Sequence, residues 1–123
     1  MQGGRRRILC AESNRDVAEL IALLLERKGY AVETVQTAAE CLRLAATERF
    51  DLYVLNDTYI DADSLELCRA LREIDPATPV LLFSLDSSGH RATRARQAGV
   101  QVYLSQTSDF VALVQTIDKL LQS

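Results

Sequence analysis

The strongest constraint on the fold is an alternation of short apolar runs with helical stretches, which repeats five times along the chain. Such alternation is typical of a parallel α/β sheet. Runs 8–11, 52–55 and 80–83 are almost continuously apolar, as expected for strands buried on both faces. Runs 31–35 and 100–104 admit polar residues and are expected at the sheet edges. With right-handed crossovers, the pattern predicts an α/β fold with a doubly wound, five-stranded parallel sheet in the order 2-1-3-4-5.

Apolar residues recur at helical spacing between the runs, and each stripe is expected to pack on the sheet. The stripes are Val17, Leu20, Ile21 and Leu24; Ala38, Cys41, Leu42 and Ala45; Leu67, Cys68, Leu71 and Ile74; and Phe110, Leu113, Val114 and Ile117. A helix at about 88–98 has only alanines as apolar residues and is expected to be the most weakly held. Thr37 with Glu40 forms a capping-box pattern, and Gly29 and Gly99 stand where left-handed C-caps are expected.

Length and composition indicate one globular domain. The 123 residues are 48% hydrophobic and 25% charged; we expect a flexible leader over 1–5, a single domain over 6–123, and frayed, solvated side chains from Arg5 to Arg7. No apolar run reaches membrane-spanning length and no secretory signal is recognised, so a cytoplasmic location is expected. A net charge of -3 argues against nucleic acid or a membrane as the main partner. The cysteine spacing fits neither disulfides nor zinc, which predicts buried free thiols at Cys10, Cys41 and Cys68.

The carboxyl ends of the expected strands bring polar residues to one edge of the sheet, where ligands of doubly wound folds bind. These residues are Glu12 and Ser13 after the first strand, Asn56 and Asp57 after the third, Ser84 at the end of the fourth, and Gln106 after the fifth. No glycine-rich phosphate loop follows any strand, which argues against a nucleotide site. His90 is the only histidine, which excludes a multi-histidine metal site.

Seven segments form one pattern that covers residues 6 to 121: 8–13, 29–32, 51–56, 63–67, 79–80, 98–100 and 103–104. Together they resemble the receiver domain of bacterial response regulators, a CheY-like family with a flavodoxin-like fold. The resemblance implies that an aspartate at the end of the third strand takes a phosphoryl group. It also implies a magnesium ion held by an acidic pair after the first strand, and a lysine after the fifth. Those positions carry Asn56, Glu12 with Ser13, and Gln106 in this chain.

These departures neutralise the pocket as a unit. The carboxamide of Asn56 has no anionic oxygen with which to attack phosphorus. Mg²⁺ prefers carboxylate oxygens, so its binding is expected to be weak or absent, with Glu12 and Asp57 as weak candidate ligands. Gln106 removes the cation that would stabilise a transferring phosphoryl group, and it can meet an amide with neutral hydrogen bonds. No cofactor is therefore expected.

Asp57 is the alternative acceptor. Side chains alternate along a strand, so Asp57 is expected to face away from the pocket if Asn56 faces into it, unless the strand has already ended. The resemblance also implies switch positions at Ser84 and Tyr103. A strand end and an edge-strand aromatic explain these two residues equally well.

Together these features predict a degenerate receiver, or pseudo-receiver, that serves two-component or phosphorelay signalling as a phosphorylation-independent interaction module and not as an enzyme. The expected partner is a protein in trans, either a histidine kinase or an output protein, and the oligomeric state stays open. The expected docking surface comprises the fourth helix, fifth strand and fifth helix, with Arg91, Arg94 and Tyr103, although a basic helix face is also typical of solvated surface. The alternatives are a phosphorylatable receiver that uses Asp57 with Mg²⁺, a small-ligand sensor with a neutral pocket, and, more distantly, an enzyme; the sensor pocket would comprise Asn56, Gln106, Ser84 and Ser13.

Overall fold

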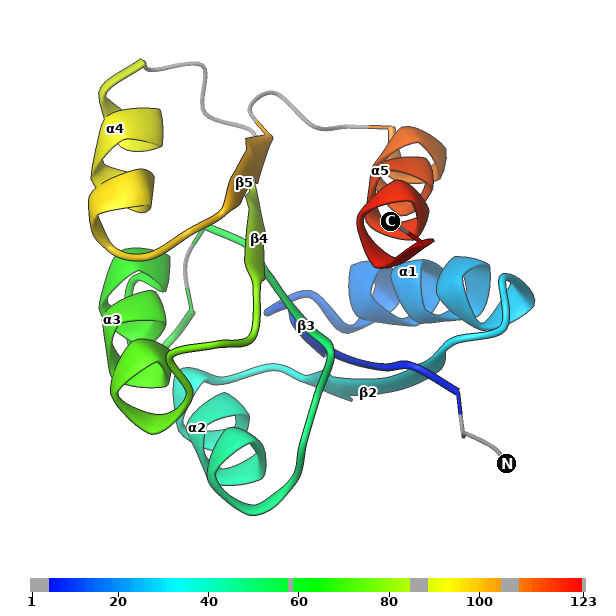
Figure 1. The fold of residues 1–123 in the computed structure, drawn as a ribbon, viewed down its shortest axis with the longest axis horizontal. Coiled ribbons are helices and arrows are strands. Elements are labelled where there is room, and N and C mark those ends of the chain that lie inside the picture. Colours follow the sequence, from blue (N-terminus) through cyan, green and yellow to red (C-terminus); the bar gives the residue numbers. More distant parts are fainter. Residues whose placement is uncertain (1–4, 58, 85–88, 105–108, 123) are drawn as a thin grey trace.

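The computed structural model describes residues 5–57, 59–84, 89–104 and 109–122 (Figure 1). Five strands form one parallel sheet in the order β2-β1-β3-β4-β5, which confirms the predicted topology. The strands are β1 (Arg7–Ala11), β2 (Ala31–Val35), β3 (Leu52–Leu55), β4 (Val80–Phe83) and β5 (Val102–Leu104). The central strands β3 and β4 are buried throughout, whereas β2 and β5, at the edges, are partly exposed. The apolar runs therefore correctly distinguished central from edge strands.

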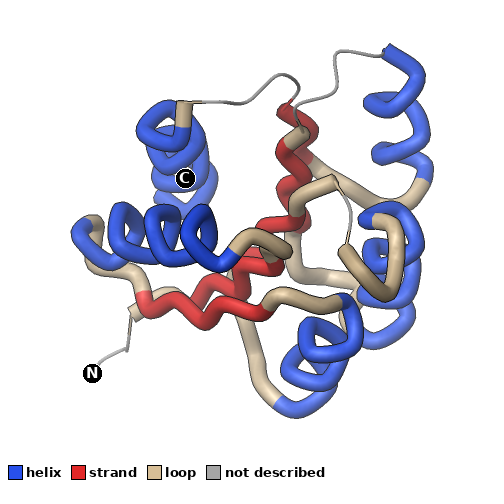
Figure 2. The backbone as a smooth tube through the Cα atoms, turned by 180° about the vertical axis from the view of Figure 1, so that it is seen from behind, coloured by secondary structure: helices blue, strands red, loops and turns tan. Residues whose placement is uncertain are grey.

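Helices cover both faces of the sheet. They are α1 (Arg15–Arg27), α2 (Ala38–Thr47), α3 (Ser64–Ile74), α4 (Gly89–Gln97) and α5 (Phe110–Gln122). Figure 1 shows α1 and α5 on one side of the sheet and α2, α3 and α4 on the other. Figure 2 shows from behind how the twisted strands run between these two layers.

The core has two parts because successive strand residues point to opposite faces. Ile8 and Cys10 of β1 join the cluster that includes Ile21 of α1 and Ile117 of α5. Leu9, with its neighbours on the other face, joins the cluster of α2, α3 and α4. All three cysteines are free and buried, as predicted. Among the described residues, no helix is long and apolar enough to cross a bilayer.

Helix ends follow local side-chain chemistry, with one correction. The Thr37 hydroxyl accepts a hydrogen bond from Glu40 N (3.2 Å), but the Glu40 carboxylate accepts from Gln36 N and not from Thr37 N. The predicted capping box is therefore only half formed. A complete capping box occurs at the start of α3, between Asp63 and Glu66.

Two predicted apolar stripes are partly wrong. In α1 the fully buried residues are Ala18, Ile21 and Leu25, and Leu20 is 42% exposed. The helix is turned so that the small Ala18 faces the core, which carries Leu20 round to the solvent side at 100° per residue. In α3, Ile74 is 41% exposed because it lies in the last turn, beyond the buried Leu71.

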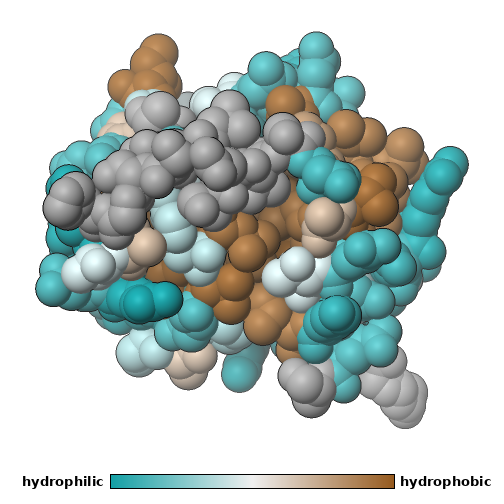
Figure 3. Space-filling view, turned by 90° about the horizontal axis from the view of Figure 1, so that it is seen from above, coloured by the Kyte–Doolittle hydropathy of each residue, from teal (hydrophilic) through white to brown (hydrophobic). Residues whose placement is uncertain are grey.

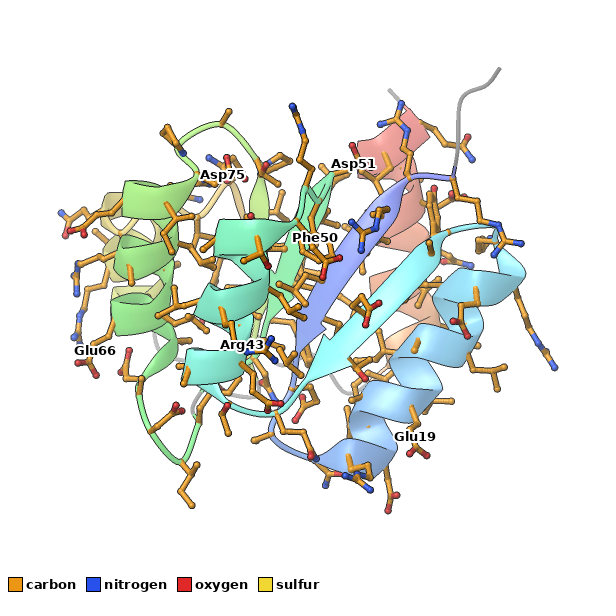
Figure 4. All side chains as sticks on the ribbon, turned by 90° about the horizontal axis from the view of Figure 1, so that it is seen from below. Glu19, Arg43, Phe50, Asp51, Glu66 and Asp75 are labelled. Carbon is orange, nitrogen blue, oxygen red and sulfur yellow. The ribbon has the colours of Figure 1, made fainter. Side chains whose placement is uncertain are left out.

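Arg7 is a structural residue, so the expectation of a frayed, solvated arginine is wrong at this position. It is the first residue of β1, and its backbone N–H donates to the Asp51 carboxylate (2.7 Å). Its guanidinium stacks over the Phe50 ring, 4.6 Å from the centroid, and pairs with Glu48. Figure 4 labels Phe50 and Asp51 near the start of β1. The Arg7 side chain therefore packs at the end of the sheet where β1 begins.

Gly29 and Gly99 both have positive φ, at 98° and 104°, as their C-cap positions predict. They differ in surroundings. A Cβ on Gly99 would lie 2.8 Å from Arg72 Cγ, whereas a Cβ on Gly29 would meet nothing within 4 Å. Arg72 donates to the carbonyls of Gly99 and Thr78, and so ties the end of α3 to the loops that precede β5 and β4.

We expect Gly99→Ala to lower the free energy of unfolding by about 2–4 kcal/mol, since it combines left-handed backbone strain with displacement of the Arg72 hydrogen bonds. Gly29→Ala is the matched control, because it carries the backbone strain alone and is expected to cost about 1–2 kcal/mol. Urea unfolding measures both values. Equal losses would show that the Arg72 contact contributes nothing.

Candidate functional site

Polar residues gather at the carboxyl ends of three adjacent strands. Glu12 follows β1, Asn56 and Asp57 follow β3, and Ser84 follows β4. The sheet order places β3 between β1 and β4, so these residues come together as the sequence predicted. Glu12 is 1% exposed and Ser84 is fully buried, while Asn56 and Asp57 are half-buried.

The centre of the site is a hydrogen bond between Asn56 and Glu12. Asn56 Nδ2 donates to Glu12 Oε1 (2.5 Å), and Asn14 N donates to Glu12 Oε2 (2.7 Å). The Ser13 hydroxyl lies 3.5 Å from Glu12 Oε2. Burial raises the pKa of the Glu12 carboxyl, with a smaller contribution from the Asp57 charge, and the hydrogen bonds from Asn14 and Asn56 oppose that shift. Both oxygens of the buried carboxylate are thus occupied by donors from the protein.

Tyr59 fastens the loop after β3 to the end of β1. Its buried hydroxyl donates to the Ala11 carbonyl (2.7 Å) and accepts from Asn56 N (2.9 Å). Burial raises the pKa of Tyr59 well above its ordinary value, so the hydroxyl keeps its proton. Sequence reasoning missed this residue; the available signal was the single aromatic residue in the loop after the third strand, next to a polar pocket.

Asp61 fastens the same loop to α2. Its carboxylate accepts hydrogen bonds from Ala38 N (2.8 Å) and Ala39 N (2.9 Å), at the start of that helix. These bonds lower the pKa of Asp61. A carboxylate is favourable at a helix N-terminus, where backbone N–H groups lack partners. Sequence reasoning missed the role of Asp61, since no local pattern indicates a helix cap supplied by another element.

The Asp57 side chain faces Ser84, which follows β4. Strand β3 ends at Leu55, so the alternation expected of strand residues no longer applies at Asp57. Asp57 Oδ2 accepts a hydrogen bond from the Ser84 hydroxyl (2.7 Å). The strand has therefore already ended at Asp57, and Asp57 does not face away from the pocket.

The other predicted site residues are described only in part. Tyr103 is partly buried, and its hydroxyl is buried without a hydrogen-bond partner among the described residues. Arg94 is exposed on α4, as expected of either a partner surface or a solvated face. Gln106, and the side chain of Arg91, lie outside the part of the chain that the structure describes.

Comparison with known proteins decides the family. The sequence-family model for the response regulator receiver domain matches residues 8–118 of this chain. The chain belongs to this family. It is a receiver domain of a response regulator, from two-component signalling.

Two curated relatives extend this assignment. The chain is 30% identical over 115 residues to the transcriptional regulatory protein GlrR of Escherichia coli K12, covering 94% of this chain and 26% of that protein. It is 32% identical over 116 residues to the response regulator MprA of Mycolicibacterium vanbaalenii, covering 94% of this chain and 50% of that protein. The receiver therefore spans only a quarter to a half of the length of these relatives.

Solved receiver structures share the fold. A CheY-like receiver domain protein from Methanospirillum hungatei superposes with a TM-score of 0.89 at 23% identity, over 97% of this chain and 95% of that chain. A Burkholderia pseudomallei response regulator with a phosphorylated aspartic acid and a calcium ion superposes with a TM-score of 0.81 at 26% identity, over 95% of this chain and 71% of that chain. The described backbone thus has the fold of a receiver domain.

Proposed function

We propose that this receiver is a pseudo-receiver, which works as a protein-interaction module without phosphorylation at the family's usual position. The observation that carries the proposal is the Asn56–Glu12 hydrogen bond. Asn56 occupies the position at which receivers carry the acceptor aspartate, and its amide is bonded to the buried carboxylate of Glu12. A neutral carboxamide is not a nucleophile toward phosphorus.

The donor set does not fit Mg²⁺. An octahedral Mg²⁺ site takes carboxylates and waters, and Glu12 is the only carboxylate among the aligned positions. Its oxygens already accept from Asn56 and Asn14, so a cation would have to displace those donors. Within the described ranges, no group of three histidine, cysteine or acidic side chains is arranged to hold a metal ion.

A preset surface is consistent with this role. Tyr59 and Asp61 hold the loop after β3 against β1 and α2. A ligand shifts a conformational equilibrium only if it binds the two states differently, so an unmodified pocket requires a partner that recognises one preset state.

The partner surface that we propose comprises α4, β5 and α5. Figure 3 views this end of the molecule and shows apolar side chains gathered toward the α5 side, with polar side chains around them. Val111, in the first turn of α5, is 55% exposed, and Arg94 of α4 is exposed. A kinase or output protein that docks here in trans, in the cytoplasm, would meet both apolar and basic groups. Direct nucleic-acid binding forms no part of the proposal.

A second candidate is a receiver that is phosphorylated on Asp57. The observation that favours it is the Ser84–Asp57 hydrogen bond, which places this carboxylate beside a pocket hydroxyl. The sequence supplies Gln106 where receivers carry a lysine, so the usual cation would be missing from such a reaction. The small-ligand sensor stays an untested alternative.

Intact-mass spectrometry separates the first two candidates. The protein is incubated with acetyl phosphate and Mg²⁺ beside an ordinary receiver as positive control, and we expect no gain of a phosphoryl group. A gain that disappears in Asp57→Asn would establish the second candidate. A gain that persists in Asp57→Asn would indicate another acceptor and would equally refute the pseudo-receiver.

A further inference from the structure

The outward face of α1 carries apolar side chains that core packing does not explain. Leu20 and Leu23 are 42% and 49% exposed. At 100° per residue, both lie on the side of the helix opposite the buried Ala18, Ile21 and Leu25. The two leucines form one small apolar patch on the outermost face of the helix.

Two opposite charges complete this face. Asp16 in the first turn and Arg27 in the last turn are both exposed, and neither has an ion pair with another described residue. Asp16, Leu20, Leu23 and Arg27 are spaced by four, three and four residues, which is the spacing of a coiled-coil seam. They fall within an arc of about 60° and span about 16 Å. We call these four residues the α1 seam.

The α1 seam is complementary to itself. When two copies of α1 pack antiparallel about a two-fold axis, Leu20 of each copy faces Leu23 of the other. In the same register Asp16 of each faces Arg27 of the other, because both pairs have the same midpoint between residues 21 and 22. A two-fold interface requires this reciprocal matching. The acid at the start of the helix and the base at its end also suit the helix dipole, so the seam costs α1 no stability.

We propose that this chain forms a homodimer through antiparallel packing of α1 against α1 of a second copy. Glu19, which points away from the sheet in Figure 4, lies at the edge of the seam and keeps the rim polar. The dimer uses neither the polar pocket nor α4, β5 and α5, so it is independent of the proposed function.

The dimer is expected to be weak. One helix of 13 residues on each side buries less than a standard interface. We therefore expect a dissociation constant of about 10–100 µM and an equilibrium between monomer and dimer. Added salt is expected to weaken it, since both ion pairs lie at the exposed ends of the seam.

Sedimentation equilibrium on a charge-exchange series tests the proposal. Asp16→Arg places two arginines opposite each other at both ends of the seam, and Arg27→Asp places two aspartates there. Each variant is expected to raise the dissociation constant about tenfold. The double variant D16R/R27D restores both pairs and is expected to return within about threefold of the unaltered protein. An equimolar mixture of the two single variants is expected to form the heterodimer in preference to either homodimer.

Leu20→Ser with Leu23→Ser is expected to abolish the dimer. Val111→Ser and Ile74→Ser remove equally exposed apolar side chains elsewhere and are expected to leave it unchanged. Circular dichroism and thermal unfolding confirm that each variant is folded. The proposal is overturned if the unaltered protein stays monomeric up to about 1 mM. It is also overturned if a dimer forms that ignores the charge exchange, or if the double variant is no better than the single ones.

Discussion

Replacing Asn56 with aspartate alone is expected to destabilise the protein by about 2–4 kcal/mol at pH 7. The substitution removes the amide that donates to Glu12 Oε1 and places a second carboxylate against a buried one. The Glu12 pKa is already raised by burial, and a neighbouring carboxylate raises it further. Urea unfolding at pH 7 measures the loss.

The destabilisation caused by Asn56→Asp is expected to depend on pH. An acid whose pKa is higher in the folded protein than in the unfolded chain binds its proton more tightly when folded, so stability falls as pH rises through that range. We expect Asn56→Asp to be less destabilised at pH 5 than at pH 8. The double variant E12Q/N56D is the matched control, because it exchanges acid and amide and restores the hydrogen bond. If it is as unstable as Asn56→Asp, the Glu12–Asn56 contact is not the cause.

Restoring the family's residues is expected to produce a new chemical activity. The triple variant S13D/N56D/Q106K supplies a second carboxylate after β1, an acceptor after β3 and a cation after β5. Carboxylates suited to Mg²⁺ and a lysine beside the phosphoryl group are what phosphoryl transfer needs, so acetyl phosphate with Mg²⁺ is expected to modify it stoichiometrically. Intact mass and hydroxylamine release identify the acyl phosphate.

Two controls make that gain interpretable. S13D/Q106K keeps Asn56 and is expected to stay unmodified, because it lacks the acceptor. Omission of Mg²⁺ is expected to abolish modification of the triple variant. Failure of the triple variant to react, although folded, would mean that the pocket differs from a working receiver in more than these three side chains.

The sequence predicted the sheet because its signal is strong and local. The apolar runs of β3 and β4 are long enough to specify buried central strands, and the sheet order then brings Glu12 to Asn56 with no further information. The edge strands were equally readable from their polar residues. The pairing of these two residues at the site was therefore implicit in the topology.

The orientation of Asp57 and the roles of Tyr59 and Asp61 were not predictable in the same way. Asp57 faces Ser84 only because β3 ends one residue before Asn56, and strand ends have no periodic signal. Tyr59 and Asp61 bond to β1 and α2, far away in the sequence, so their partners emerge only once the chain is folded.

The orientation of α1 was also not predictable. Leu20 and Ala18 each fit an apolar stripe at helical spacing, so the sequence does not show which of the two residues faces the sheet. Periodicity gives the width of an apolar face but leaves its rotation open by about one residue. The core assigns Ala18 to the sheet, and the leucine so displaced becomes part of the α1 seam.

The most direct test of the proposal that the polar pocket does not support phosphorylation is calorimetric titration. The unaltered protein is titrated with MgCl₂ and beryllofluoride, a mimic of the phosphoryl group. A pocket in which the Asn56 amide occupies Glu12 is predicted to give no saturable heat, while the triple variant S13D/N56D/Q106K binds both ligands together. Saturable binding of Mg²⁺ and beryllofluoride by the unaltered protein would contradict the account, and would identify it as a receiver that responds to phosphorylation.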